Sequence, residues 1–127
     1  MKSALWVYGT LIGLLLFFPG CRKNPDAGGA TEIDLAGAKA IFAGRCVACH
    51  GTVGKGDGPG AAALNPKPRA FSDAAWQKSV SDAQIKQTVI AGGLAVGKSA
   101  LMPGNPDLKG NDAVLGGLVR IIRDFAK

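Results

Sequence analysis

The pentapeptide Cys46-Val47-Ala48-Cys49-His50 decides most of what this chain of 127 residues can be. Two cysteines separated by two residues, and followed at once by a histidine, form the C-x-x-C-H pattern that is typical of covalent haem attachment. In that chemistry each thiol adds to one vinyl group of the haem, and the tether holds the histidine beneath the iron. Imidazole is a suitable ligand for iron, so His50 is the predicted proximal ligand.

Three competing interpretations of the motif are weaker. A thioredoxin-like redox C-x-x-C needs a surrounding βαβ pattern, which the sequence does not show. A structural zinc site needs about four ligands, and no Cys or His follows His50. Two free core cysteines would leave the histidine unexplained. The motif therefore predicts one covalent haem c held by Cys46, Cys49 and His50.

Residues 31–127 resemble a class I cytochrome c domain with a single haem. The resemblance implies an all-α, cytochrome c-like fold of three to four helices around one covalently attached haem. It also implies the usual work of that family, which is to carry single electrons. The features that match are residues 38–42, the haem motif with Gly51, the loop at residues 56–59, the pair Met102-Pro103 and an apolar C-terminal helix ending near Phe125.

The N-terminal segment has the features of an export signal. Residues 4–18 are dominated by apolar side chains and follow Lys2. This run is shorter than the ~20 residues of a membrane span, and it fits a signal-peptide core. Pro19-Gly20-Cys21 resembles a bacterial lipoprotein cleavage site, although Phe18 and Pro19 replace the usual Leu and small residue. The alternative is an ordinary signal peptide or an uncleaved anchor, with Cys21 a bystander.

These features predict three parts of the chain. Residues 1–20 form a lipoprotein-like signal peptide, residues 21–30 a lipidated Cys21 with a flexible linker, and residues 31–127 the cytochrome c domain. Haem is attached to C-x-x-C-H after export in bacteria. We therefore expect a lipid-anchored domain in the periplasm or at the extracytoplasmic face of a membrane.

Helical periodicity and capping patterns predict an all-α domain. The first helix is expected over residues 31–44, with Leu35, Ala38 and Phe42 inward and Gly44 at its end. Ser81 to Gln84 form a capping box, and Gly92-Gly93 ends the helix that follows.

The last helix is expected to begin with Asn111 or Asp112 as its cap. Gly116-Gly117 interrupts it with poor helix formers, which a close helix crossing would explain. In cytochromes c the first and last helices cross at a small residue and an aromatic, and Ala38 and Phe42 match this on the first helix. The inward stripe consists of Val114, Leu115, Leu118, Ile121, Ile122 and Phe125.

The sixth iron ligand is predicted to be Met102. His50 is the only histidine, so ligation by two histidines of one chain is impossible. Met1 lies in the predicted signal, which leaves Met102 as the one soft side chain, and His/Met is a known cytochrome c pairing. Met102 could instead be core filler, and Lys98 is a rival ligand.

Residues around the haem are predicted from the resemblance. In the family a carbonyl in a proline-containing segment accepts the second N–H of the proximal histidine, so Pro66 or Pro68 is the candidate. Trp76 could donate its indole N–H to a haem propionate, and Arg69 could pair with one. The alternative is an ordinary core tryptophan and a surface arginine.

The net positive charge of the chain limits the classes of partner that it is expected to bind. The chain has fifteen basic and nine acidic side chains, and residues 31–127 have twelve and eight. This excess suits a redox protein that presents an acidic face. The basic residues are scattered and not interleaved with aromatics, so no nucleic-acid site is expected.

We therefore expect a monomeric, membrane-tethered periplasmic carrier of single electrons that is not an enzyme. One alternative is a haem enzyme or gas sensor with an open or displaceable sixth site, against which the missing distal histidine argues. Another alternative is a haem subunit of a larger respiratory complex.

Overall fold

A computed structural model describes residues 32–127, and this part of the chain is helical without strands. The prediction of an all-α, cytochrome c-like fold is confirmed. The helical run at the start comprises α1 (Leu35–Ile41), a π-helical turn η1 (Phe42–Cys46) and α2 (Val47–His50). After it come the 3₁₀ turn η2 (Pro59–Ala63), α3 (Ala74–Ser79), α4 (Asp82–Ala95), the 3₁₀ turn η3 (Pro106–Leu108) and α5 (Asp112–Asp124).

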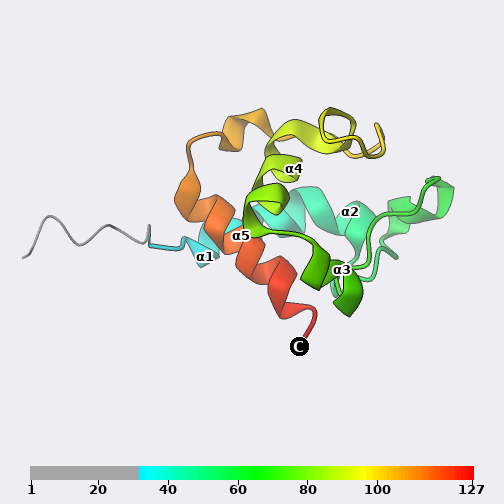
Figure 1. Ribbon diagram of the computed structural model, residues 1–127, viewed down its shortest axis with the longest axis horizontal. Helices are drawn as coiled ribbons and strands as arrows, with labels where there is room; N and C mark the ends of the chain where they lie inside the picture. Colours follow the sequence, from blue (N-terminus) through cyan, green and yellow to red (C-terminus); the bar gives the residue numbers. More distant parts are fainter. Residues whose placement is uncertain (1–31) are drawn as a thin grey trace, which may run out of the picture.

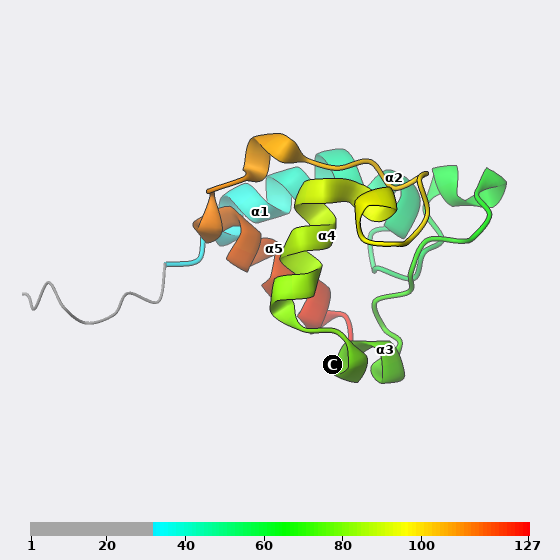
Figure 2. The same ribbon diagram turned by 45° about the horizontal axis from the view of Figure 1, so that its top comes forward.

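The helices and the loops gather at different ends of the molecule. α1 crosses α5, and α4 also packs on α5 (Figure 1). The long segment between α2 and α3 and the segment after α4 lie together with α2, away from the chain's entry into α1 (Figures 1 and 2). We call α2, residues 51–73 and residues 96–105 the loop end.

The crossing of α1 and α5 depends on Gly117. Ala38 is completely buried there. A Cβ atom on Gly117 would lie 2.6 Å from Ala38 Cβ and 2.6 Å from the carbonyl oxygen of Asp34, which is far too close. A Cβ on Gly116 would meet only Ile33 Cγ1, at 3.4 Å. The close crossing predicted from the glycine pair is therefore confirmed, and Gly117 is the residue that permits it.

One buried cluster links these helices. Phe42, the first residue of η1, packs against Phe125 with ring centroids 5.6 Å apart and against Phe71 at 6.5 Å. Phe71 belongs to the loop end, so the buried cluster extends from the helices into the loop end. The buried members of the cluster are Ala38, Phe42, Phe71, Ile85, Val89, Leu108, Val114, Leu115, Leu118, Val119 and Ile122.

Two predicted helix starts are confirmed. The N–H of Gln84 donates to Ser81 Oγ at 3.2 Å, and the N–H of Ser81 donates to Gln84 Oε1 at 2.8 Å, which completes the capping box of α4. Asn111 caps α5 by accepting the N–H of Val114 at 3.2 Å.

The predicted end of the first helix at Gly44 is wrong. The helical run continues through Gly44 to His50, and the N–H of Val47 bonds back to the carbonyl of Phe42, five residues earlier. Gly44 lacks the left-handed φ that a helix-ending glycine adopts, so it does not stop the run. Leu35, expected to face inward, is 39% exposed.

The helix end predicted at Gly92-Gly93 is found only in part, because the helical geometry breaks at Gly92 but α4 ends at Ala95. The backbone of Gly92, with φ +79° and ψ 170°, departs from the helix, and one further turn follows before the end of α4. Glycine tolerates this conformation because it has no Cβ. The break redirects the chain toward the segment that carries Met102.

The predicted signal peptide, Cys21 and the linker lie outside the described residues. Within residues 32–127, no helix is long and apolar enough to cross a bilayer.

Candidate functional site

The haem motif occupies one helical turn. Cys46 ends η1, and Cys49 and His50 follow on α2, so the three side chains stand at i, i+3 and i+4 on one helix face. All three are half-buried, and both thiols are free. Burial raises the pKa of the Cys46 thiol, against the opposing effect of the Arg45 charge. The thiol is therefore protonated at neutral pH.

A glycine-rich loop holds the end of this turn. Gly51 stops the helix with φ +78° and ψ 161°, a conformation confined almost entirely to glycine. The N–H of Gly56 donates to the carbonyl of His50 at 2.9 Å, and the N–H of Gly58 donates to that of Cys49 at 3.1 Å. The loop thus pairs carbonyls that a helix end leaves free, and it fixes the backbone at Cys49 and His50.

The imidazole of His50 is held in one orientation. Its Nδ1 lies 3.2 Å from the carbonyl oxygen of Arg69, and its ring stacks on Phe71 with centroids 4.5 Å apart and planes 13° from parallel. Because a carbonyl only accepts, Nδ1 carries the hydrogen, and Nε2 is the nitrogen with a free lone pair. Burial lowers the pKa of His50, although the hydrogen bond to Arg69 opposes the shift. A neutral imidazole is the form that binds a metal.

The carbonyl beside His50 is not one of the two expected. Pro66 is exposed and Pro68 is half-buried, and the acceptor belongs to Arg69, the next residue. The proline-containing segment therefore supplies the acceptor, one position later than predicted. The Arg69 guanidinium is exposed and lies 3.4 Å from Asp73.

Trp76 is half-buried on α3 and packs on Phe71, with ring centroids 5.6 Å apart. It thus supports the ring that stacks on His50. The propionate contacts predicted for Trp76 and Arg69 stay predictions.

Met102 lies in the segment between α4 and η3, which belongs to the loop end. Its side chain is half-buried, and its carbonyl accepts the N–H of Gly93 at 3.0 Å. Three residues later, Asn105 accepts a hydrogen bond at 3.2 Å from Arg45, the residue before Cys46. The structure thus links the segment of Met102 to the helix that carries the haem motif.

The loop end and the adjoining end of α4 expose large apolar side chains. Val53, in the loop after α2, is 52% exposed, Leu94 is 73% exposed, and Leu101, beside Met102, is 52% exposed. Exposed large apolar side chains are candidates for contact with a bound group. Two thiols, an oriented imidazole, a thioether and uncovered apolar side chains together fit a covalently attached haem.

Three residues of the site were missed by sequence reasoning. Arg45 adjoins the motif and could have been singled out as a charge beside Cys46. Phe71 follows the proline-containing segment as a lone aromatic and could have been assigned to the haem pocket. Asn105 gave no local signal, because its partner Arg45 is sixty residues away.

The comparisons with known proteins agree with this chemistry. The profile of the family described as cytochrome c matches residues 35–114. The matched stretch runs from α1 into α5 and contains Cys46, Cys49, His50 and Met102. Searches of curated proteins and of solved structures gave no match.

Proposed function

Because the chain belongs to the cytochrome c family, we propose that it is a single-electron carrier with one haem in His/Met ligation, tethered outside the cytoplasm. The family binds a covalent c-type haem with iron, and it transfers electrons. The finer points are our proposal: the ligand pair, the number of haems and the anchor. The observation that carries the proposal is the fixed imidazole of His50 beside the two free thiols.

The bound haem supplies an iron that changes between the ferrous and ferric states. The chain's own residues prepare its surroundings. Arg69 orients His50 through Nδ1, so that Nε2 faces away from that carbonyl. Phe71 covers one face of the imidazole and keeps water from it. An oriented, neutral ligand changes little between redox states, which favours a carrier.

Met102 completes this proposal as the sixth ligand. A thioether stabilises reduced iron and raises the reduction potential. If His50 and Met102 both bound the iron, no position on it would be left for a substrate. The chain therefore acts as a carrier rather than as a haem enzyme or a gas sensor.

A redox partner with an acidic face fits the charges at the loop end. Lys55 and Lys98 lie there in exposed positions, and neither belongs to the ion pairs found among residues 32–127. Unpaired surface lysines favour encounter with acidic proteins and raise association rates at low salt. We propose such a partner for a monomeric carrier that binds no nucleic acid.

The tether is supported by the N-terminal sequence. An apolar run at residues 4–18 precedes Cys21, and residues 22–30 supply a short polar linker. Mass spectrometry of protein from membranes tests this proposal. A mature chain that begins elsewhere, or an unchanged membrane fraction in Cys21→Ser, would contradict it.

The haem and its ligands are tested on the purified protein. Haem should stay with the polypeptide after denaturation in acid organic solvent, and loss of haem would contradict covalent attachment. Ferrous protein should bind carbon monoxide weakly, and Met102→Ala should bind it readily at a lower potential. Rapid carbon monoxide binding by the native protein, with a spectrum unchanged in Met102→Ala, would favour the enzyme or sensor function instead.

A further inference from the structure

Residues 93–107, here called the strap, comprise the last turn of α4, the segment that carries Met102, and the start of η3. The strap begins against the break in α4. A Cβ on Gly92 would lie 2.7 Å from the Gly104 nitrogen and 2.9 Å from the Met102 carbonyl oxygen. The N–H of Gly93 also bonds to that carbonyl. The strap therefore lies directly on the α4 backbone around Met102.

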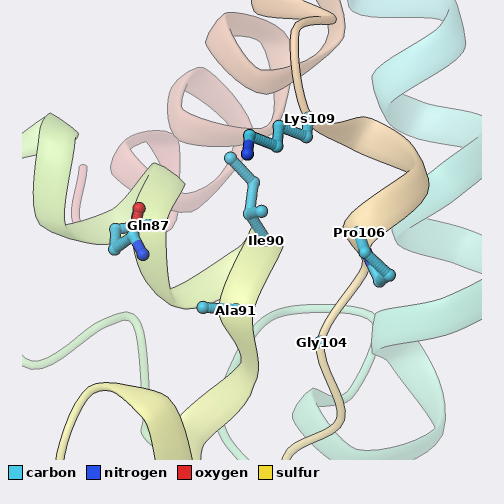
Figure 3. A pocket seen from close by; sticks show the side chains of 6 residues that line it. All are labelled: Gln87, Ile90, Ala91, Gly104, Pro106 and Lys109. Carbon is cyan, nitrogen blue, oxygen red and sulfur yellow. The ribbon is translucent and has the colours of Figure 1, made fainter.

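The returning leg of the strap is fastened by Asn105. Its backbone N–H lies 3.0 Å from the carbonyl of Val89 and 2.9 Å from that of Ile90, and its side-chain Nδ2 donates to Val89 at 3.0 Å. Figure 3 shows Gly104 and Pro106 on the strap running beside Ile90 of α4. One residue thus binds the strap to α4 through both its backbone and its side chain.

The oxygen of the Asn105 side-chain amide accepts a hydrogen bond from Arg45 of η1, the residue before Cys46. Arg45 Nη1 donates to Asn105 Oδ1 at 3.2 Å and to Asp107 Oδ2 at 2.8 Å. The Arg45–Asp107 pair is exposed, and an exposed ion pair alone contributes little. Asn105 is half-buried, and losing its amide would leave the Val89 carbonyl with fewer partners. Asn105 is therefore the stronger fastening, and Arg45 orients it.

We propose that Asn105, oriented by Arg45, is the positioning residue that keeps Met102 on the iron. This inference rests on the proposed His/Met ligation. The strap exchanges between a closed state, with Met102 in place, and a lifted state in which an external ligand enters. Asn105 favours the closed state because its bonds exist only there. The apparent affinity for an external ligand scales with the population of the lifted state.

The test uses the full-length holoprotein with Asn105→Leu, which removes both amide bonds, and Asn105→Asp, which keeps an acceptor for Arg45. Asn105→Leu should raise the apparent affinity of ferrous protein for carbon monoxide about tenfold, as expected for a lost hydrogen bond to a charged group. Asn105→Asp should raise it less. The sulfur-to-iron charge-transfer band of the ferric protein should weaken in parallel. Arg45→Ala should raise the carbon monoxide affinity less than Asn105→Leu does. Arg45→Lys, which keeps the positive charge, should raise it less than Arg45→Ala does.

Two controls separate positioning from stability. Ser81→Ala removes the cap of α4 and weakens the fold without touching the strap. Arg120→Ala removes an exposed pair with Asp124 similar to that of Arg45. Both should leave the band and the carbon monoxide affinity unchanged. Equal effects of Ser81→Ala and Asn105→Leu, or wild-type behaviour of Asn105→Leu, would overturn the proposal.

Amide hydrogen exchange distinguishes two possible failures: that Asn105 does not hold the strap in place, and that Met102 does not bind the iron. The N–H groups of Gly93 and Lys98 bond within the strap and report its lifting. Their exchange should be about tenfold faster in Asn105→Leu. A native protein without the sulfur band would refute Met102 as ligand, and accelerated exchange would then still support the fastening. Unchanged exchange would overturn the fastening whatever the ligand.

Discussion

The crossing of α1 and α5 and the loop end differ in how completely protein atoms fill them. At the crossing, Ala38, Leu115 and Leu118 have 2% of their surface exposed or less. At and beside the loop end, Leu94 and Leu101 stand largely in solvent. The side chains at the crossing are thus packed by other protein atoms, whereas large apolar side chains at and beside the loop end remain exposed to solvent. The fold builds its frame from its own side chains and leaves the other end for the cofactor to close.

The largest expected effect is that of haem itself. Burying three apolar side chains such as Val53, Leu94 and Leu101 contributes roughly 5 kcal/mol in total, which is comparable with the whole stability of a small domain. Protein produced without haem should therefore lose about 5 kcal/mol of unfolding free energy, measured in denaturant. Amide protection should fall first at the loop end. Equal protection of the loop end with and without haem would contradict the comparison.

A second test joins the two ends. Phe71 belongs to the buried cluster and also stacks on His50. Phe71→Ala should cost about 3–4 kcal/mol of unfolding free energy, because it leaves a cavity in the core. It should also broaden the pH range over which His50 detaches from iron, seen in the optical spectrum. Phe71→Leu should recover much of the stability and less of the spectrum. Full recovery of both would mean that stacking plays no part.

The crossing is tested by one substitution at two adjacent positions. Gly117→Ala should destabilise by about 2 kcal/mol, because its Cβ would collide with Ala38 and with the Asp34 backbone. Gly116→Ala has room and should stabilise by up to about 1 kcal/mol through helix propensity. Denaturant unfolding of the two holoproteins measures both. The same sign at both positions would refute the close crossing.

The smallest effect concerns a charge on α5. Hydrogen bonds from Lys127 and then Arg120 lower the pKa of Asp124, which lies at the surface. A lowered carboxyl pKa adds stability above the unfolded-state pKa, and that stability is lost as the pH falls through the folded-state pKa. Asp124→Asn should flatten the stability profile slightly in this acidic range. A profile that matches the native one would show that the contact adds nothing.

The features of this fold that depend on residues close in sequence could be predicted. The capping box at Ser81 and the cap at Asn111 need only neighbours in sequence, and both were predicted correctly. The haem motif likewise carries its chemistry in five residues. The strap could not be predicted, because Asn105 meets Arg45 and Val89 only after folding. The Arg69 carbonyl is a backbone atom and leaves no mark on residue type.

The π-helical turn η1 sets the phase of the haem motif. An α-helix advances about 100° per residue, and a π turn accommodates one residue more. The α-helical periodicity that places Ala38 and Phe42 on one buried face therefore does not predict the direction in which Cys49 and His50 point. The added residue lets α1 dock on α5 while Cys49 and His50 on α2 point in another direction. Deleting one residue at Gly44 would keep Cys46, Cys49 and His50 and rotate them by about 100° relative to α1.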